Sequence, residues 1–180
     1  ANACLDHADA IMLSGETANG KYPLEAVKIM ANIAREVEDN ISSFINIPYT
    51  TDDKITAYLA KAAVKASLRL NTKAIVADSM TGKSIRALSA YRGDNPIYAQ
   101  VYDKNVMRQL SLSFGVFSDY INLGPDSTQT LRKSICTMLD KKQIQDDTLI
   151  IVLGGSFGIK QGATYIEVST ALNFKNQCRL

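Results

Sequence analysis

Apolar residues recur at every third or fourth position from Pro23 onward, and charged residues fill the positions between them. That spacing predicts an amphipathic helix, and proline suits its first turn because the missing N–H would have no helical acceptor there. The short apolar run from Asp9 to Ser14 predicts a strand before this helix. Residues 41–52 keep no sustained period and contain serine, threonine and proline, which predicts a linker. The chain is therefore expected to form two units, residues 1–40 and residues 53–180.

Beyond the linker, short apolar runs alternate with segments of helical period. A helix over 53–70 comes first, and its small apolar residues indicate close packing. The predicted strands that follow are 74–77, 97–101, 116–120 and 149–153, with predicted helices at 82–91, 105–114 and 126–139 between them. Such alternation is typical of parallel strands joined by crossover helices. A last strand over 164–169 follows only a loop, so we expect it at an antiparallel edge. The predicted fold class is α/β, an open and mostly parallel sheet of about five strands with helices on both faces.

The composition is that of an ordinary folded domain. Of the 180 residues, 46% are hydrophobic and 21% charged, which excludes disordered and fibrous classes. Twenty Lys and Arg against 18 Asp and Glu give a net charge of +2, too balanced to indicate a nucleic-acid partner. Three widely spaced cysteines without a CxxC pair support neither disulfides nor a metal site and fit a cytoplasmic setting. We expect no membrane span, because no apolar run approaches the required length.

One loop concentrates hydroxyls and a lysine between a predicted parallel strand and a helix. Its members are Ser79, Thr81, Gly82, Lys83 and Ser84. Backbone N–H groups and the helix dipole favour an anion at such a position, so the loop is a candidate phosphate site. The Gly-Lys-Ser tail matches a nucleotide-binding P-loop, but Ala77 stands where that motif needs its first glycine, which argues against a nucleotide hydrolase. The alternative is an ordinary helix start capped by Thr81 or Ser79, with Lys83 in solvent.

A second loop, from Gly154 to Gly162, follows the strongly apolar strand at 149–153. Ligands of open α/β sheets gather at the carboxyl ends of strands, so this loop and the first can meet over one crevice. Its candidate ligand-binding residues are Gly155, Ser156, Gly158, Lys160 and Gly162. The alternative is a connector in which the glycines only turn the chain. The lone His7 and the Ser14–Thr17 segment have no partners at a recognisable catalytic spacing, so we predict no catalytic residue and no metal ligand.

Two sets of residues resemble the pyruvate kinase family. Asn2–Asp6, Asp9–Ala18, Gly20 and Tyr22–Val27 resemble the last strand and helix of that family's catalytic barrel, which makes residues 1–40 a barrel fragment. Residues further along resemble the family's C-terminal regulatory domain, which would be residues 53–180. These are Lys73–Val76, Ser79–Ser84, Ala90–Arg92 and Pro96–Ala99.

The resemblance implies the activity of the intact enzyme. It transfers a phosphoryl group from phosphoenolpyruvate to ADP, uses Mg²⁺ and usually K⁺, and works inside a (β/α)₈ barrel, commonly as a homotetramer. A complete barrel takes about 250 residues, so we expect this chain alone to be inactive and to bind neither ion. Its expected partners are the rest of the barrel, further copies of the subunit and a phosphorylated small molecule.

Many family members hold an effector phosphate in a loop of the pattern T-x-S-G-x-S. The loop Ser79–Ser84 matches it with serine for the first threonine and threonine for the middle serine. Members that respond to fructose 1,6-bisphosphate have tryptophan and arginine in the second loop, where this chain has Ser156 and Phe157 and no tryptophan anywhere. The effector therefore stays open among a sugar monophosphate, a nucleotide monophosphate, another bisphosphate and none. The leading hypothesis is an allosteric domain, and its alternatives are an interface module with an unused phosphate loop or a separate phosphate-binding protein.

Overall fold

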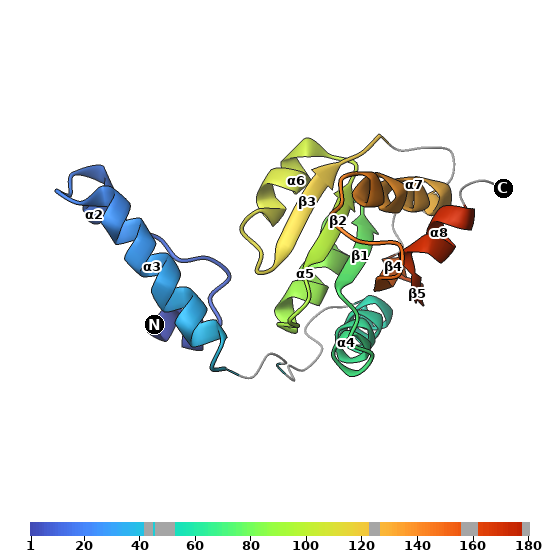
Figure 1. Cartoon of the computed structure of the whole chain (residues 1–180), viewed down its shortest axis with the longest axis horizontal. Helices are drawn as coiled ribbons and strands as arrows, with labels where there is room; N and C mark the ends of the chain where they lie inside the picture. The colour runs from blue at the N-terminus through green and yellow to red at the C-terminus, as the bar shows by residue number, and fades with distance from the viewer. Residues whose placement is uncertain (42–44, 46–52, 123–126, 156–161, 178–180) are drawn as a thin grey trace. The chain divides into compact units, whose positions relative to one another are not determined.

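The computed structural model describes residues 1–41, 45, 53–122, 127–155 and 162–177. The chain divides into two compact units, Ala1–Ser43 and Phe44–Leu180 (Figure 1). Apart from residues 41 and 45, the predicted linker lies outside the described residues.

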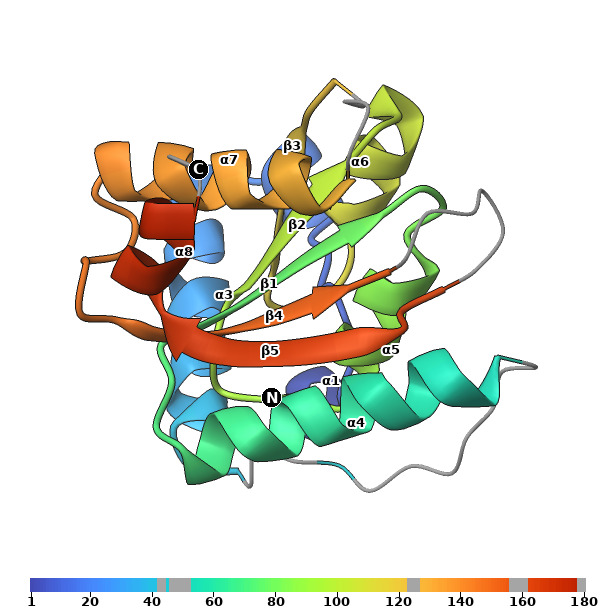
Figure 2. The ribbon, with the colours of Figure 1, turned by 90° about the vertical axis from the view of Figure 1, so that its right-hand side faces the viewer.

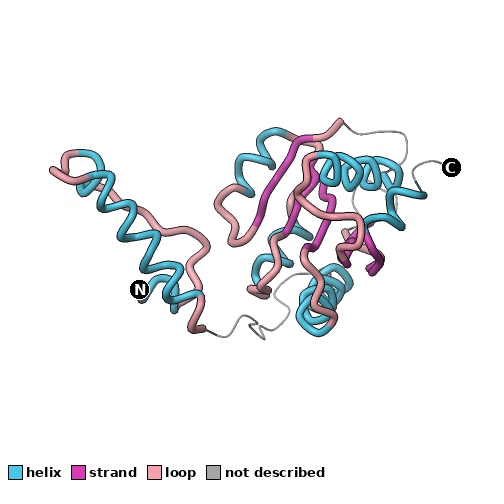
Figure 3. The backbone as a smooth tube through the Cα atoms, in the orientation of Figure 1, coloured by secondary structure: helices cyan, strands magenta, loops and turns pink. Residues whose placement is uncertain are grey.

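The regular structure of the first unit consists of helices joined by irregular segments. It contains α1 (Asn2–Leu5), α2 (Gly15–Ala18) and α3 (Pro23–Glu38), and Pro23 occupies the first turn of α3 as its conformation favours. The strand predicted over Asp9–Ser14 is wrong: these residues form neither helix nor strand (Figure 3). A strand needs a neighbour that takes up its backbone hydrogen bonds, and the described residues of this unit contain no other strand.

The second unit is built on one five-stranded sheet. Its strands are β1 (Ala74–Ser79), β2 (Ile97–Val101), β3 (Val116–Tyr120), β4 (Leu149–Gly154) and β5 (Tyr165–Thr170). The order across the sheet is β3-β2-β1-β4-β5, and every pairing is parallel except that of β4 with β5. The predicted α/β fold class and its antiparallel edge are confirmed.

Helices cover both faces of this sheet (Figure 2). They are α4 (Lys54–Arg69), α5 (Lys83–Ala90), α6 (Lys104–Leu110), α7 (Ser127–Asp140) and α8 (Ala171–Gln177). The helix predicted to reach Phe114 ends earlier, because the chain turns and Gly115 adopts a positive φ of 67°. The sequence analysis missed α8, which the fully buried side chains of Ala171 and Phe174 fix to the core.

Side chains along β1 point alternately to the two faces of the sheet, so the core has two layers. Ile75 and Ala77 pack on one face with side chains of α4, α5 and α6. Ala74 and Val76 pack on the other face with α7 and α8. The crossover helix that follows β1, α5, and the one that follows β3, α7, lie on opposite faces of the sheet. The sheet therefore has its topological switch point between β1 and β4. Open α/β sheets bind ligands at the carboxyl ends of the strands at such a point.

Candidate phosphate-binding site

The loop between β1 and α5 leaves the sheet at this switch point. Gly82 adopts a left-handed conformation with φ +79°, and its N–H donates to Ser79 Oγ at 2.9 Å. A side chain at this position would also crowd Arg86 and Val106. Only glycine adopts that backbone without strain, so Gly82 both turns the chain and starts the helix. The N-cap residue is Gly82 rather than Thr81 or Ser79, and it makes no side-chain capping bond to the N–H groups of α5. Lys83 is exposed, as the alternative of an ordinary helix start expects.

Hydrogen bonds hold the back of the loop in place. Ser84 is buried, and its Oγ donates to the carbonyl of Asp78 at 3.2 Å. The guanidinium of Arg86 donates to the carbonyl of Thr81 at 3.0 Å and to Gln109 Oε1 at 3.1 Å. Thr81 and Lys83 are exposed at the front of the loop. The loop therefore offers solvent a hydroxyl, an ammonium and the first N–H groups of α5, which have no acceptor within the helix. These groups can bind an oxyanion.

The second predicted loop reaches the same edge of the sheet. Gly155 and Gly162 are described, whereas Ser156, Gly158 and Lys160 lie outside the described residues. Gly162 packs so closely on the start of α4 that any side chain there would overlap Thr56 Oγ1 and Asp53 Oδ2. The glycine is thus required for the close approach of this loop to α4.

Asp53 connects the two loops electrostatically. Its carboxylate caps α4 by accepting from the Thr56 N–H at 3.0 Å and the Thr56 hydroxyl at 2.6 Å. These two bonds lower the pKa of Asp53, and the positive charge of Lys83 lowers it further. The start of α4, the end of the glycine-rich loop and the β1–α5 loop therefore share one edge of the sheet. Figure 2 shows that α4 begins at the end of the sheet where β1 and β4 finish.

A half-buried acid, Asp78, lies beside the loop and was missed by the sequence analysis. The Tyr102 hydroxyl donates to Asp78 Oδ2 at 2.8 Å. Burial raises the pKa of Asp78, with the Tyr102 bond acting in the opposite direction. Burial and the nearby carboxyl group raise the pKa of Tyr102. An aspartate that directly follows the apolar run of a central strand was the signal available in the sequence.

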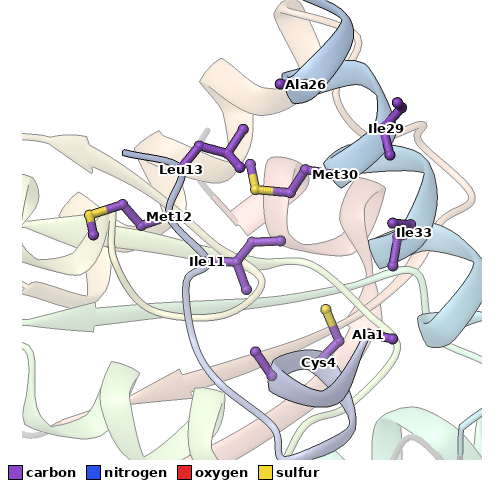
Figure 4. A pocket seen from close by; sticks show the side chains of 10 residues that line it. Ala1, Cys4, Ile11, Met12, Leu13, Ala26, Ile29, Met30 and Ile33 are labelled. Carbon is purple, nitrogen blue, oxygen red and sulfur yellow. The ribbon is translucent and has the colours of Figure 1, made fainter. Parts of the chain in front are cut away.

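The first unit carries an apolar pocket of about 420 Å³. Figure 4 shows Ile11 and Leu13 on the side of the chain that faces Met30, while Met12 projects the other way. The other candidates in this unit bond locally: the Ser14 N–H donates to Glu16 Oε2 at 3.0 Å. Across the described ranges of the whole chain, no three His, Cys, Asp or Glu side chains could hold a metal ion. No helix described here is long and apolar enough to cross a bilayer.

These features define a class: an open-sheet α/β domain with a candidate anion-binding loop at its switch point, preceded by a helical unit with an apolar pocket. The family description "Pyruvate kinase, alpha/beta domain" matches residues 57–169, and "Pyruvate kinase, barrel domain" matches residues 1–27. The chain belongs to the pyruvate kinase family. The barrel match also identifies the first unit as a fragment of that domain.

Relatives and solved structures agree with this assignment. The chain is 38% identical to a pyruvate kinase of Borreliella burgdorferi over 94% of this chain and 37% of the relative. It is 35% identical to a pyruvate kinase of Bacillus licheniformis over 88% of this chain and 28% of the relative. A crystal structure of a Cryptosporidium parvum pyruvate kinase matches with a TM-score of 0.78 and 26% identity, covering 94% of this chain and 34% of that one. The chain thus spans about a third of the length of the proteins it matches.

Proposed function

We propose that this chain is the C-terminal part of a pyruvate kinase, which transfers a phosphoryl group from phosphoenolpyruvate to ADP in the cytoplasm. Residues 53–180 act as its regulatory domain, and residues 1–40 complete the catalytic barrel. Relatives named pyruvate kinase, matched over most of this chain, support the activity. The Mg²⁺ and K⁺ of the reaction bind in the remainder of the barrel. Alone, the chain is inactive.

The regulatory role rests on one observation above all. The β1–α5 loop places an exposed threonine and lysine at the start of a helix, at the switch point of the sheet. A phosphorylated small molecule bound there stabilises the arrangement of the homotetramer that binds it more tightly. Differential affinity of this kind typically supplies about 1–3 kcal/mol of coupling.

A second candidate function is an interface module whose loop binds nothing. Exposed apolar side chains on α4 favour it, with Ile55 at 66% and Tyr58 at 62% of their full exposure. Both functions can occur in one domain. A ligand measurement separates them.

The test is calorimetric titration of the full-length protein with fructose 6-phosphate, ribose 5-phosphate, glucose 6-phosphate, AMP and fructose 1,6-bisphosphate. We expect saturable binding of at least one ligand and a roughly tenfold loss of affinity in Lys83→Ala, because a charged contact to phosphate is removed. Lys73→Ala is the matched control: Lys73 is also exposed but precedes β1, at the opposite end of the strand. If none of these ligands binds, or if the wild type and both variants bind with equal affinity, the result supports the interface module instead.

A further inference from the structure

A polar cluster lies beside the phosphate loop, on the face of the sheet that α7 covers. Asp78 follows Ala74 and Val76 in the alternation of β1, so its side chain points to that face. Its Oδ2 accepts from the hydroxyl of Tyr102, the residue that directly follows β2, at 2.8 Å. The carbonyl of Asp78 accepts from Ser84 Oγ at 3.2 Å, and Ser84 lies in the first turn of α5. The cluster is therefore joined to the phosphate loop by a hydrogen bond.

Tyr165 extends this cluster from the other side of β1. It pairs with Gly154, and any side chain at that glycine would overlap the hydroxyl end of the Tyr165 ring. The ring thus lies across β4, which is the neighbour of β1 in the sheet. Burial, the Asp78 carboxyl group and Tyr165 all raise the pKa of Tyr102, so the two phenols are close enough to interact. The three side chains share the carboxyl edge of β1, β2 and β4 at the switch point.

The chemistry of this cluster suits hydroxyl groups better than a second phosphate. Its three side chains are half-buried and carry no positive charge. A carboxylate has about four acceptor positions. Among the described residues, Asp78 receives two hydrogen bonds, from the Tyr102 hydroxyl and from its own backbone N–H. Burial nevertheless raises the pKa of Asp78, because these bonds do not replace all the water that the carboxylate loses. Ligand hydroxyls can donate to the remaining positions.

We infer that this cluster recognises the hydroxyl groups of a sugar whose phosphate is held by the β1–α5 loop, so the ligand of the site is a sugar phosphate. This inference rests on the proposed function, because it names the class of ligand for the same site. Asp78 accepts from the ligand hydroxyls, and Tyr102 is a positioning residue that holds the carboxylate in place. A few placed polar groups of this kind fix the orientation of a bound small molecule.

The test separates the sugar from the phosphate by comparing ribose 5-phosphate with ethyl phosphate, which carries a phosphoryl group but no hydroxyl groups on its carbons. Calorimetry on the full-length protein gives both dissociation constants, and their ratio reports the contribution of the sugar hydroxyls. Asp78→Asn removes the charged acceptor, and Tyr102→Phe removes the donor that holds it. Tyr120→Phe is the matched control: the Tyr120 hydroxyl also donates to a side chain, Asn122 Oδ1 at 3.0 Å, but β3 lies two strands from β1.

We expect the wild type to bind ribose 5-phosphate more tightly than ethyl phosphate by about tenfold or more, because hydrogen bonds to a charged group are among the stronger ones. Asp78→Asn should reduce this ratio about fivefold and Tyr102→Phe about threefold. Tyr120→Phe should leave the ratio unchanged. Lys83→Ala should weaken the binding of both ligands alike, because it acts on the phosphate that they share.

Three outcomes would contradict the inference. A ratio near one in the wild type, or an unchanged ratio in both Asp78→Asn and Tyr102→Phe, overturns it but leaves the proposed function intact if Lys83→Ala still weakens binding. Binding of AMP about tenfold more tightly than ribose 5-phosphate would assign the cluster to a nucleobase and also overturn it. Absence of binding by these probes and by the whole ligand panel overturns both the inference and the proposed function.

Discussion

Helices α3 and α4 have the same length of 16 residues and comparable apolar spacing, yet they differ entirely in burial. Six residues of α4 are buried, because β1, β4 and α5 supply an apolar surface opposite them. No residue of α3 is buried, and Leu24, Ile29 and Ile33 stay exposed. The period of a sequence thus predicts a helix, but the burial of its apolar face depends on what packs against it. The α/β unit supplies its own partner elements, whereas the first unit leaves an apolar face and a pocket uncovered.

A paired substitution gives the largest expected contrast between the units. Leu88→Ala should lower the free energy of unfolding by about 3 kcal/mol, because Leu88 is fully buried between α5 and the sheet. Ile29→Ala, at 57% exposure on α3, should change it by less than about 0.5 kcal/mol. Urea unfolding of the 180-residue chain, followed by circular dichroism, measures both. Equal losses in the two variants would show that the first unit has a core of its own and would break the comparison.

Substitutions at two glycines test the same comparison with smaller expected changes in stability. Gly162→Ala should destabilise the α/β unit by about 1–2 kcal/mol, because the new methyl group meets the Asp53 and Thr56 side chains. Gly15→Ala should be neutral, since no atom lies within 4 Å of the added carbon. Thermal unfolding of both variants distinguishes them. If Gly162→Ala unfolds at the wild-type temperature, the glycine-rich loop is not held against α4.

The smallest expected effect is a change in how the free energy of unfolding depends on pH. The raised pKa of Asp78 means that the folded state binds its proton more tightly than the unfolded state. That stabilisation is complete below the unfolded pKa and is lost as the pH rises through the folded pKa. Asp78→Asn should therefore be more stable than the wild type at pH 7.5 by about 1 kcal/mol, with the difference shrinking toward pH 4.

Glu16 in the first unit is the contrast for Asp78. Backbone hydrogen bonds lower its pKa, so any stabilisation it gives is present above the unfolded pKa and lost as the pH falls. Glu16→Gln should show a pH dependence of the opposite sign in the same denaturation series. A constant stability difference between Asp78→Asn and the wild type from pH 4 to 7.5 would contradict a raised pKa of Asp78 in the folded state.

Most elements of the α/β unit were predictable because they are set by local period and turn residues, whereas α8 (Ala171–Gln177) was missed. All five strands were found from short apolar runs, and the glycine at position 82 marked the start of α5. The contacts that define the site were not predictable, because they join distant segments: Tyr102 reaches Asp78, and Gly162 packs on Asp53. The prediction of a strand at Asp9–Ser14 was wrong because a strand also depends on a partner elsewhere in the fold. Its pattern suits a strand, but no pairing partner is described in its unit.

The most direct test of the central claim, that the α/β unit folds by itself and holds a phosphate site, is an NMR titration of residues 44–180 with inorganic phosphate. We predict a dispersed amide spectrum, with saturable chemical-shift changes confined to the β1–α5 loop and the start of α5. In Lys83→Ala the spectrum should stay dispersed, but the phosphate-induced shift changes should be lost. A collapsed spectrum would contradict independent folding. A dispersed spectrum that phosphate leaves unchanged at Thr81, Gly82 and Lys83 would contradict the phosphate site.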